Sequence, residues 1–247
     1  MAKLSVNNIS KSYDNKEIIK DISLEVNDGE IVCLLGVSGV GKTTLFNIIS
    51  GLSIPDTGRV FLDSKDITGQ TGYISYMLQK DLLLPYKTVL DNVSLPLILR
   101  GENKKIAGLK ASKHFKVFGL DGSQDKYPHQ LSGGMRQRAA LLRTYLFSQQ
   151  VALLDEPFSA LDAITKRAMH SWYQNVMKKI KLSTLFITHD IDEAITLSNR
   201  IYIMAGKPGR IIEELKIEYQ KPREEGFILS DEFIRYKKCI LNVLHNS

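Results

Sequence analysis

The chain has 247 residues, of which 43% are hydrophobic and 24% are charged, so it can bury a sizeable core in one globular domain. Its net charge of +6 comes from basic residues scattered along the chain, so it does not indicate a nucleic-acid partner. Residues 1–13 do not show the charged start and apolar core of a signal peptide, no apolar stretch is long enough to span a bilayer, and no metal-binding spacing surrounds Cys33 or Cys239. We therefore expect a protein of the reducing cytoplasm that reaches a membrane only through a partner.

The first third of the chain alternates short strand-like runs with one helix. Strands are predicted at 4–10, 18–26 and 31–36, and the last is apolar throughout, as in a strand buried on both faces. Helical spacing follows, with Leu45, Ile48 and Ile49 on one face and Gly51 as the stop. Residues 59–63 and 72–78 are predicted to be further strands.

The region 87–135 is mostly helical in pattern, with breaks expected at Pro96, Gly101 and Pro128, and is predicted to form a helical subdomain. A helix to about Phe147 then leads into strands at 151–155, 184–188 and 200–204, which alternate with helices at 163–181 and 191–198. A hairpin is expected near 208–210, and Ser230 is placed to cap a last helix. The order predicts an α/β fold whose sheet is largely parallel, with an antiparallel β portion near the N-terminus.

The segment GVSGVGKT, residues 36–43, lies between a predicted strand and a predicted helix and matches the P-loop pattern in full. Its glycines let successive backbone N–H groups face a phosphate, Lys42 reaches the terminal phosphates, and the Thr43 hydroxyl can ligate Mg²⁺. The motif predicts a P-loop NTPase (RecA-like) core that binds ATP and Mg²⁺. The other nucleotide contacts expected here are Gly36, Ser38, Gly39, Gly41 and Thr44.

Polar residues follow three other predicted strands. Asp155 and Glu156 end the apolar run VALL, where Asp155 can hold Mg²⁺ and Glu156 can face the γ-phosphate. His189 leaves the same sheet edge and can donate to the γ-phosphate, while Gln79 can sense Mg²⁺ or the attacking water. Tyr13 can stack on adenine. Taken singly, an acidic pair at a strand exit, a lone histidine and an aromatic near a hairpin are as readily structural.

The segment LSGGM, residues 131–135, is a second phosphate cradle, because Ser132 can cap a helix whose N-terminus attracts anions. A helix over 132–147 spans about 24 Å and separates Ser132 from the P-loop of its own chain. We therefore expect a head-to-tail pair, in which Ser132, Gly133 and Gly134 of one copy face the γ-phosphate held by the other.

Together these motifs resemble the ATP-binding subunits of ABC transporters over nearly the whole chain. The resemblance makes Tyr13 the adenine-stacking aromatic, GVSGVGKTT the Walker A motif, Gln79 the Q-loop glutamine, LSGGM the signature, LLDEP the Walker B motif, SALD at 159–162 the D-loop ending in Asp162, and His189 the H-loop histidine. In that family the glutamate matching Glu156 is the general base. The implied division is a single domain, with an ATP-binding core at 1–86 and 136–220, a helical subdomain at 87–135 and a helical tail at 221–247 packed on the core.

A narrower resemblance points to the importers of nitrate, sulfonates and taurine, a branch that also takes up thiamine-pyrimidine precursors. It depends on QKDLLLPYKTVLDNV, LSGGMRQR, THDIDEA and the KPGRI hairpin followed by KPRE, and Met135, where the wider family usually has Gln, also points to this branch. The chain departs from the branch at Tyr86, which replaces a usual Trp, and at LLRTYLF, which replaces a more usual alanine-rich helix. The resemblance implies a homodimer at the cytoplasmic face of the membrane beneath two permease subunits, with an extracytoplasmic solute-binding protein as an indirect partner.

Two other classes of ATP- or GTP-binding protein fit these motifs less well than a transport ATPase does. Soluble ABC proteins that act on nucleic acid or ribosomes usually carry two cassettes or long insertions, and this chain has neither. P-loop kinases and GTPases act without a signature supplied by a second copy, so LSGGM and SALD argue against them.

Overall fold

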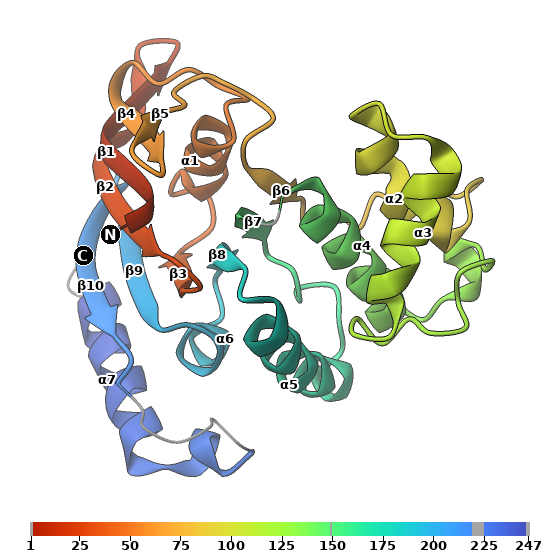
Figure 1. Cartoon of the computed structure of the whole chain (residues 1–247). Coiled ribbons are helices and arrows are strands. Elements are labelled where there is room, and N and C mark those ends of the chain that lie inside the picture. The colour runs from red at the N-terminus through yellow and green to blue at the C-terminus, as the bar shows by residue number, and fades with distance from the viewer. Residues whose placement is uncertain (1, 149, 219–224, 246–247) are drawn as a thin grey trace.

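A computed structural model describes residues 2–148, 150–218 and 225–245. Its centre is a six-stranded sheet with the strand order β10-β9-β3-β8-β7-β6, in which only β10 runs antiparallel to its neighbour (Figure 1). The strands are β3 (Ile31–Gly36), β6 (Ser75–Met77), β7 (Val151–Asp155), β8 (Ser183–Thr188), β9 (Arg200–Ala205) and β10 (Arg210–Lys216). The prediction of an α/β fold with a largely parallel sheet is confirmed.

A second, antiparallel sheet has the order β2-β1-β4-β5 and is built from β1 (Ala2–Tyr13), β2 (Lys16–Asn27), β4 (Thr57–Leu62) and β5 (Lys65–Asp66). The β1–β2 hairpin turns at Asp14 and Asn15, whose φ angles of 49° and 60° are the left-handed values that a two-residue hairpin favours. Helix α1 (Lys42–Ile49) lies between the two sheets and shares one buried cluster with both. That packing fixes the helix that follows the P-loop.

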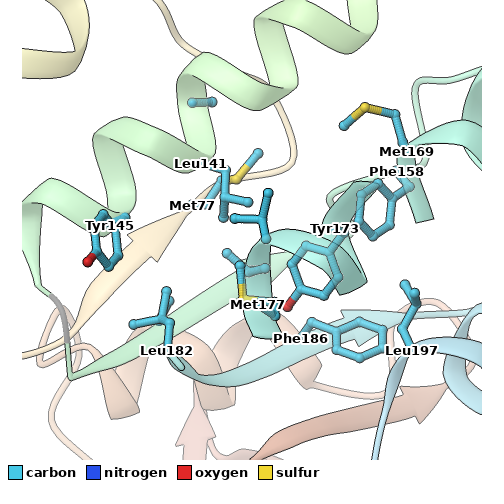
Figure 2. Close-up of a cluster of buried hydrophobic side chains, with 14 of the residues drawn as sticks. Met77, Leu141, Tyr145, Phe158, Met169, Tyr173, Met177, Leu182, Phe186 and Leu197 are labelled. Atoms are coloured by element: carbon cyan, nitrogen blue, oxygen red, sulfur yellow. The ribbon is translucent and has the colours of Figure 1, made fainter. Parts of the chain in front are cut away.

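The other face of the central sheet is covered by α4 (Gly133–Phe147), α5 (Ala163–Ile180) and α6 (Ile191–Leu197). Figure 2 shows the core beneath them, where Tyr173 and Phe158 from the α5 side meet Phe186 of β8. Tyr173 and Phe186 are 1% exposed, and the rings of Phe158 and Tyr173 meet edge to face at 5.6 Å. These helices are therefore anchored to the strands that end at the predicted site.

The helical part of the chain comprises α2 (Val89–Leu99), α3 (Lys104–Phe115) and the 3₁₀ turn η1 (Pro128–Gln130), which lie beside the core in Figure 1. Gly101 ends the first helix with φ 92°, as predicted. The break predicted at Pro96 is wrong, because Pro96 lies inside α2. Burial of Val89, Val93 and Pro96 outweighs the one backbone hydrogen bond that proline removes.

The predicted strand 72–78 is also shorter than expected, since only Ser75–Met77 pairs with β7 and Gly72 has φ 94°. The C-terminal part contains the short 3₁₀ segment η2 (Glu225–Leu229) and α7 (Asp231–His245), which packs on α6 and β9. Ser230 caps α7 by accepting from the Phe233 N–H at 3.2 Å, as predicted. Residues 221–224, 246 and 247 of the predicted tail lie outside the described residues. Among the helices that are described, none has the length and apolar character needed to cross a bilayer.

Candidate nucleotide site

The P-loop connects β3 to α1 in a shape that only glycine permits at two of its positions. A Cβ on Gly36 would lie 2.5 Å from the backbone oxygen of Met204, and one on Gly41 would lie 2.4 Å from Ile19 Cγ2. Gly41 also has φ 109°, a conformation that residues with side chains rarely adopt. The glycines thus let the chain turn tightly against β9 and β2 while α1 starts with uncapped N–H groups.

Lys42 is folded back onto this loop. Its ammonium donates to the carbonyl oxygens of Gly36 at 2.7 Å and Val37 at 2.9 Å, and the residue is 7% exposed. Burial lowers the pKa of Lys42, while the nearby charges of Glu156 and Asp155 oppose that shift. A cavity of about 320 Å³ opens beside it, lined by Ile18, Ser38, Gly39, Gly41, Lys42, Thr43, Thr44, Asp155, Glu156 and Ile187. The two motifs predicted to share a nucleotide therefore face one cavity.

Asp155 ends β7 at the carboxyl edge of the parallel sheet, where it is 9% exposed. Burial raises its pKa, with hydrogen bonds from Tyr76 and Thr43 and the charge of Lys42 opposing. Tyr76 Oη donates to Asp155 Oδ2 at 3.3 Å, a contact that the sequence did not indicate. Thr43 and Asp155 supply a hydroxyl and a carboxylate oxygen, which are the ligand types that Mg²⁺ takes along with phosphate oxygens and water.

Glu156 lies next to this cavity, and both of its carboxylate oxygens are engaged. Oε1 lies 2.9 Å from His189 Nδ1, and Oε2 accepts from Gln79 Nε2 at 3.2 Å. The Gln79 amide also lies 3.3 Å from the hydroxyl of Ser159, the first residue of the SALD motif, for which the sequence predicted no contact here. Residues from three strand ends therefore meet at one carboxylate, beside a second cavity of about 640 Å³ that Glu156 also lines.

The backbone at Glu156 has an unusual conformation for a residue with a side chain, with φ at 44°. Its N–H donates to the carbonyl oxygen of Ile187 on β8 at 3.1 Å, which holds the turn in place. Such left-handed backbone costs free energy and persists only where its surroundings enforce it. The turn aims the carboxylate at the edge of the P-loop cavity.

The LSGGM turn has a different position. Ser132 accepts from the Met135 N–H at 3.3 Å and caps α4, as predicted, while Gly133 and Gly134 form the first turn of that helix. None of these three residues lines the P-loop cavity, nor do three other predicted contacts, Gly36, Tyr13 and Asp162. Tyr13 is 46% exposed at the end of β1, and the Asp162 carboxylate caps α5 by accepting from the N–H groups of Ile164 and Thr165.

Helix α4 also holds the loop that follows Gln79. Arg143, on α4, donates to the carbonyl oxygens of Asp81 at 2.5 Å and Leu82 at 2.8 Å. Arg136 forms an ion pair with the Asp81 carboxylate at 3.4 Å. The helix that begins at Ser132 is thus attached to the loop that carries Gln79.

Comparison with known proteins places these features in a family. The model of the ABC transporter family matches residues 19–159, which contain the P-loop, Gln79, the LSGGM turn and Glu156. The chain belongs to the ABC transporter family. This ABC cassette is 44% identical over 215 residues to the formylaminopyrimidine import ATP-binding protein of Halalkalibacterium halodurans, a match that covers 87% of the chain and 84% of that protein. It is 37% identical over 232 residues to the nitrate import ATP-binding protein of Synechocystis sp., covering 92% of the chain and 87% of that protein.

A solved relative gives the same result at the level of the fold. A dimeric ATP-binding cassette bound to ADP and inorganic phosphate matches with a TM-score of 0.73 and 28% identity, over 87% of this chain and 99% of that one. The predicted P-loop NTPase fold, the ABC resemblance and ATP hydrolysis are thereby confirmed.

Two contacts of this ABC cassette were not predicted from the sequence, namely those that Tyr76 and Arg143 donate. Both residues are of types that are common at protein surfaces, and neither belongs to a motif.

Proposed function

We propose that this chain is the ATP-hydrolysing subunit of an importer, working with Mg²⁺ as a head-to-tail pair with a second copy. The observation that carries the proposal is the position of Glu156, held between His189 and Gln79 at the edge of the cavity that Lys42 and Asp155 line. A carboxylate fixed by two polar neighbours beside a phosphate site is placed to polarise an attacking water.

In the proposed reaction, Glu156 accepts the proton of a water whose oxygen forms a bond to the γ-phosphorus, and the bond to the bridging oxygen breaks as ADP leaves. Lys42 exchanges its two loop carbonyls for the terminal phosphates, where its charge stabilises negative charge on the transferred group. His189 donates to the γ-phosphate, and Gln79 orients the water. Backbone N–H groups of Gly36 to Thr44 hold the phosphates.

Mg²⁺ would be held by Thr43 and Asp155, with Gln79 beside it, and would neutralise charge on the phosphate oxygens. Tyr76 donates to one Asp155 oxygen and so holds the carboxylate in place, and Thr43 also contacts that carboxylate. Tyr13 would stack on the adenine base.

The Ser132 to Gly134 turn would act on the nucleotide of the partner. It lies outside the P-loop cavity of its own chain, yet α4 presents a capped N-terminus suited to an anion. The D-loop residue Asp162 would lie at the same interface. The match to a dimeric ATP-binding cassette supports this pairing. In the proposed cycle, bound ATP joins the two copies, and hydrolysis followed by loss of the products releases them.

The importer assignment is supported by relatives named for the import of formylaminopyrimidine, nitrate and aliphatic sulfonates. We infer that two copies sit at the cytoplasmic face of the membrane beneath two permease subunits, supplied indirectly by an extracytoplasmic solute-binding protein. The solute would be of the nitrate, sulfonate or taurine type, or alternatively a thiamine-pyrimidine precursor. No nucleic-acid partner is expected.

The substitution Glu156→Gln tests the site. It should bind ATP normally but lower kcat by about 10²-fold to 10⁴-fold, the range for losing a general base. The variant should then accumulate as a nucleotide-bound dimer, measured by size exclusion with ATP and Mg²⁺. The comparison variant Lys42→Ala should lose ATP binding or turnover. A Glu156→Gln protein with wild-type kcat would remove the base assignment.

Co-purification tests the importer role separately. A permease should be recovered with the tagged chain from solubilised membranes, and the same preparation reconstituted with its binding protein should take up one of the candidate solutes upon addition of ATP. Recovery of ribosomes or nucleic acid in place of a membrane protein would favour the soluble class.

A further inference from the structure

A buried charged cluster lies directly behind His189 and takes no part in the proposed reaction. Glu193, on α6, is 2% exposed, and its Oε2 accepts from the Thr188 hydroxyl at 2.7 Å. Its other oxygen, Oε1, forms an ion pair with Lys166 of α5 at 3.0 Å. His170, also on α5, places Nε2 3.6 Å from that same oxygen.

The two residues that flank His189 are both held by this cluster. Thr188, before it, donates to Glu193 and accepts from the Asp190 N–H at 3.0 Å. Asp190, after it, lies 3.3 Å from Lys166 Nζ and caps α6 by accepting from two backbone N–H groups. His189 itself is exposed, and its polar side-chain contact among the described residues is with Glu156, so the cluster holds the backbone on both sides of the residue from which the ring extends.

The cluster also reaches the first turn of α5. The backbone N–H of Lys166 donates to the carbonyl oxygen of Asp162 at 2.8 Å, and Asp162 is the cap of that helix. A shift of the D-loop would therefore move Lys166, since one rigid helical turn joins them. The path from Asp162 to His189 runs through Lys166, Glu193 and Thr188 without a gap.

The ionic state of the cluster is set by its contacts. Burial by itself would raise the pKa of Glu193, but its contacts with His170, Thr188 and Lys166 outweigh burial and hold the pKa below its usual value. Burial would likewise lower the pKa of Lys166, and its carboxylate partners Glu193 and Asp190 raise it instead. Both groups are charged at neutral pH, and an isolated buried charge would be costly, which favours one fixed arrangement.

We propose that Lys166 and Glu193 form a positioning pair that aims His189 at the reacting phosphate and transmits the position of the D-loop to it. The inference rests on the proposed function, because it gives His189 a role in hydrolysis. Neither residue touches the nucleotide cavity, so both act through Thr188 and His189.

The experiment compares Glu193→Gln and Lys166→Met with the charge-conserving Lys166→Arg. Lys178→Met is the matched control, since Lys178 is an exposed lysine of the same helix. The first two variants should lower kcat about ten-fold or more, as misplacement of a catalytic group does, while KM for ATP changes less than two-fold. Lys166→Arg and Lys178→Met should retain kcat. Thermal unfolding identifies variants that fail to fold, and Glu193→Gln, which preserves shape, is the safeguard against that outcome.

Two further measurements isolate the path through His189. In a His189→Ala background, Glu193→Gln should lower kcat no further, because the two changes remove one function. The imidazole resonance of His189 in a two-dimensional NMR spectrum should move in Glu193→Gln and stay in place in Lys178→Met.

An unmoved His189 resonance together with wild-type kcat in Glu193→Gln would overturn the positioning pair, as would additive losses in the His189→Ala background. Full activity of His189→Ala alone would refute the proposed role of His189. The NMR shift would still report whether the pair positions the ring, so the two failures are distinguishable.

Discussion

The molecule contains two glycine-rich turns that each precede a helix, and they use glycine for different reasons. In the P-loop, Gly36 and Gly41 are demanded by the chain itself, because a Cβ at either position would collide with neighbouring atoms. In the signature turn, Gly133 and Gly134 have helical backbone, and added Cβ atoms would meet their nearest neighbours at 3.6 Å and 3.4 Å, which are ordinary contacts.

This difference in the need for glycine indicates what lies close to the backbone of each turn. The P-loop is enclosed by its own sheet and faces Asp155 and Glu156. The signature turn has no internal need for glycine, so the need must arise from something outside the chain that approaches the backbone closely. A phosphate held by a second copy fits that requirement.

The largest effect is expected in mixed dimers. Lys42→Ala should inactivate every site through the P-loop, and Ser132→Arg should do so through the signature turn, leaving each homodimer inactive. Equal mixtures should regain about a quarter of wild-type turnover, because half of the dimers contain one intact composite site out of two. Steady-state ATPase assays on mixed and unmixed samples measure this. No recovery would show that the two turns do not share a nucleotide across the dimer.

Alanine substitutions at a P-loop glycine and at a signature-turn glycine should have different effects on stability. Gly36→Ala should lower the free energy of unfolding by about 1–3 kcal/mol, because its Cβ would lie 2.5 Å from the Met204 carbonyl oxygen. Gly133→Ala should leave that free energy unchanged or raise it by about 0.4–1 kcal/mol, because alanine restricts the unfolded chain. Urea denaturation gives both values.

Activity of the same pair completes the comparison. Gly133→Ala should lose ATP turnover although it folds normally, since its methyl group would occupy the space in which we propose that the partner's phosphate lies. A stable Gly133→Ala protein with full turnover would contradict the idea that the signature glycines serve a second copy.

The smallest effect concerns the charge of Asp155, beside the P-loop, and its contribution to the free energy of unfolding. Burial raises the pKa of Asp155, so the ionised carboxylate destabilises the nucleotide-free chain above that pKa. Asp155→Asn should therefore raise the free energy of unfolding at pH 7. The gain should shrink as the pH falls through the raised pKa and vanish below the ordinary value of 3.8, where the wild-type group is protonated in both states. Urea denaturation between pH 7 and pH 3.5 measures the difference in the free energy of unfolding between Asp155→Asn and the wild type. A difference that grows on acidification would contradict the raised pKa of Asp155.

The parts of this protein that could be predicted from sequence are those in which neighbouring residues act together. The P-loop was readable because Gly36, Lys42 and Thr43 lie within eight residues of one another, between a strand and a helix. Glu156 and His189 were assigned to one sheet edge because parallel strands end on the same side, and they lie 2.9 Å apart.

The parts that could not be predicted depend on how distant elements pack. Pro96 was expected to break a helix because its local effect is unfavourable, and burial against the rest of the helical region reversed that outcome. The contacts from Tyr76 to Asp155 and from Lys166 to Glu193 span 79 and 27 positions in sequence. Nothing near a single tyrosine or lysine distinguishes such a residue from a solvated one.

The attachment of Arg143 to the loop after Gln79 has a mechanical consequence. Ser132 caps the helix that carries Arg143, the two residues are about 16.5 Å apart along its axis, and an α-helix of this length bends little. When the partner copy displaces the signature turn, α4 must displace the Asp81–Leu82 segment at the same time. No loop has to reorder first. Because α4 moves as a rigid body, the size of the displacement of the Asp81–Leu82 segment is fixed by the geometry of the helix. Its timing is fixed by the binding of the second copy.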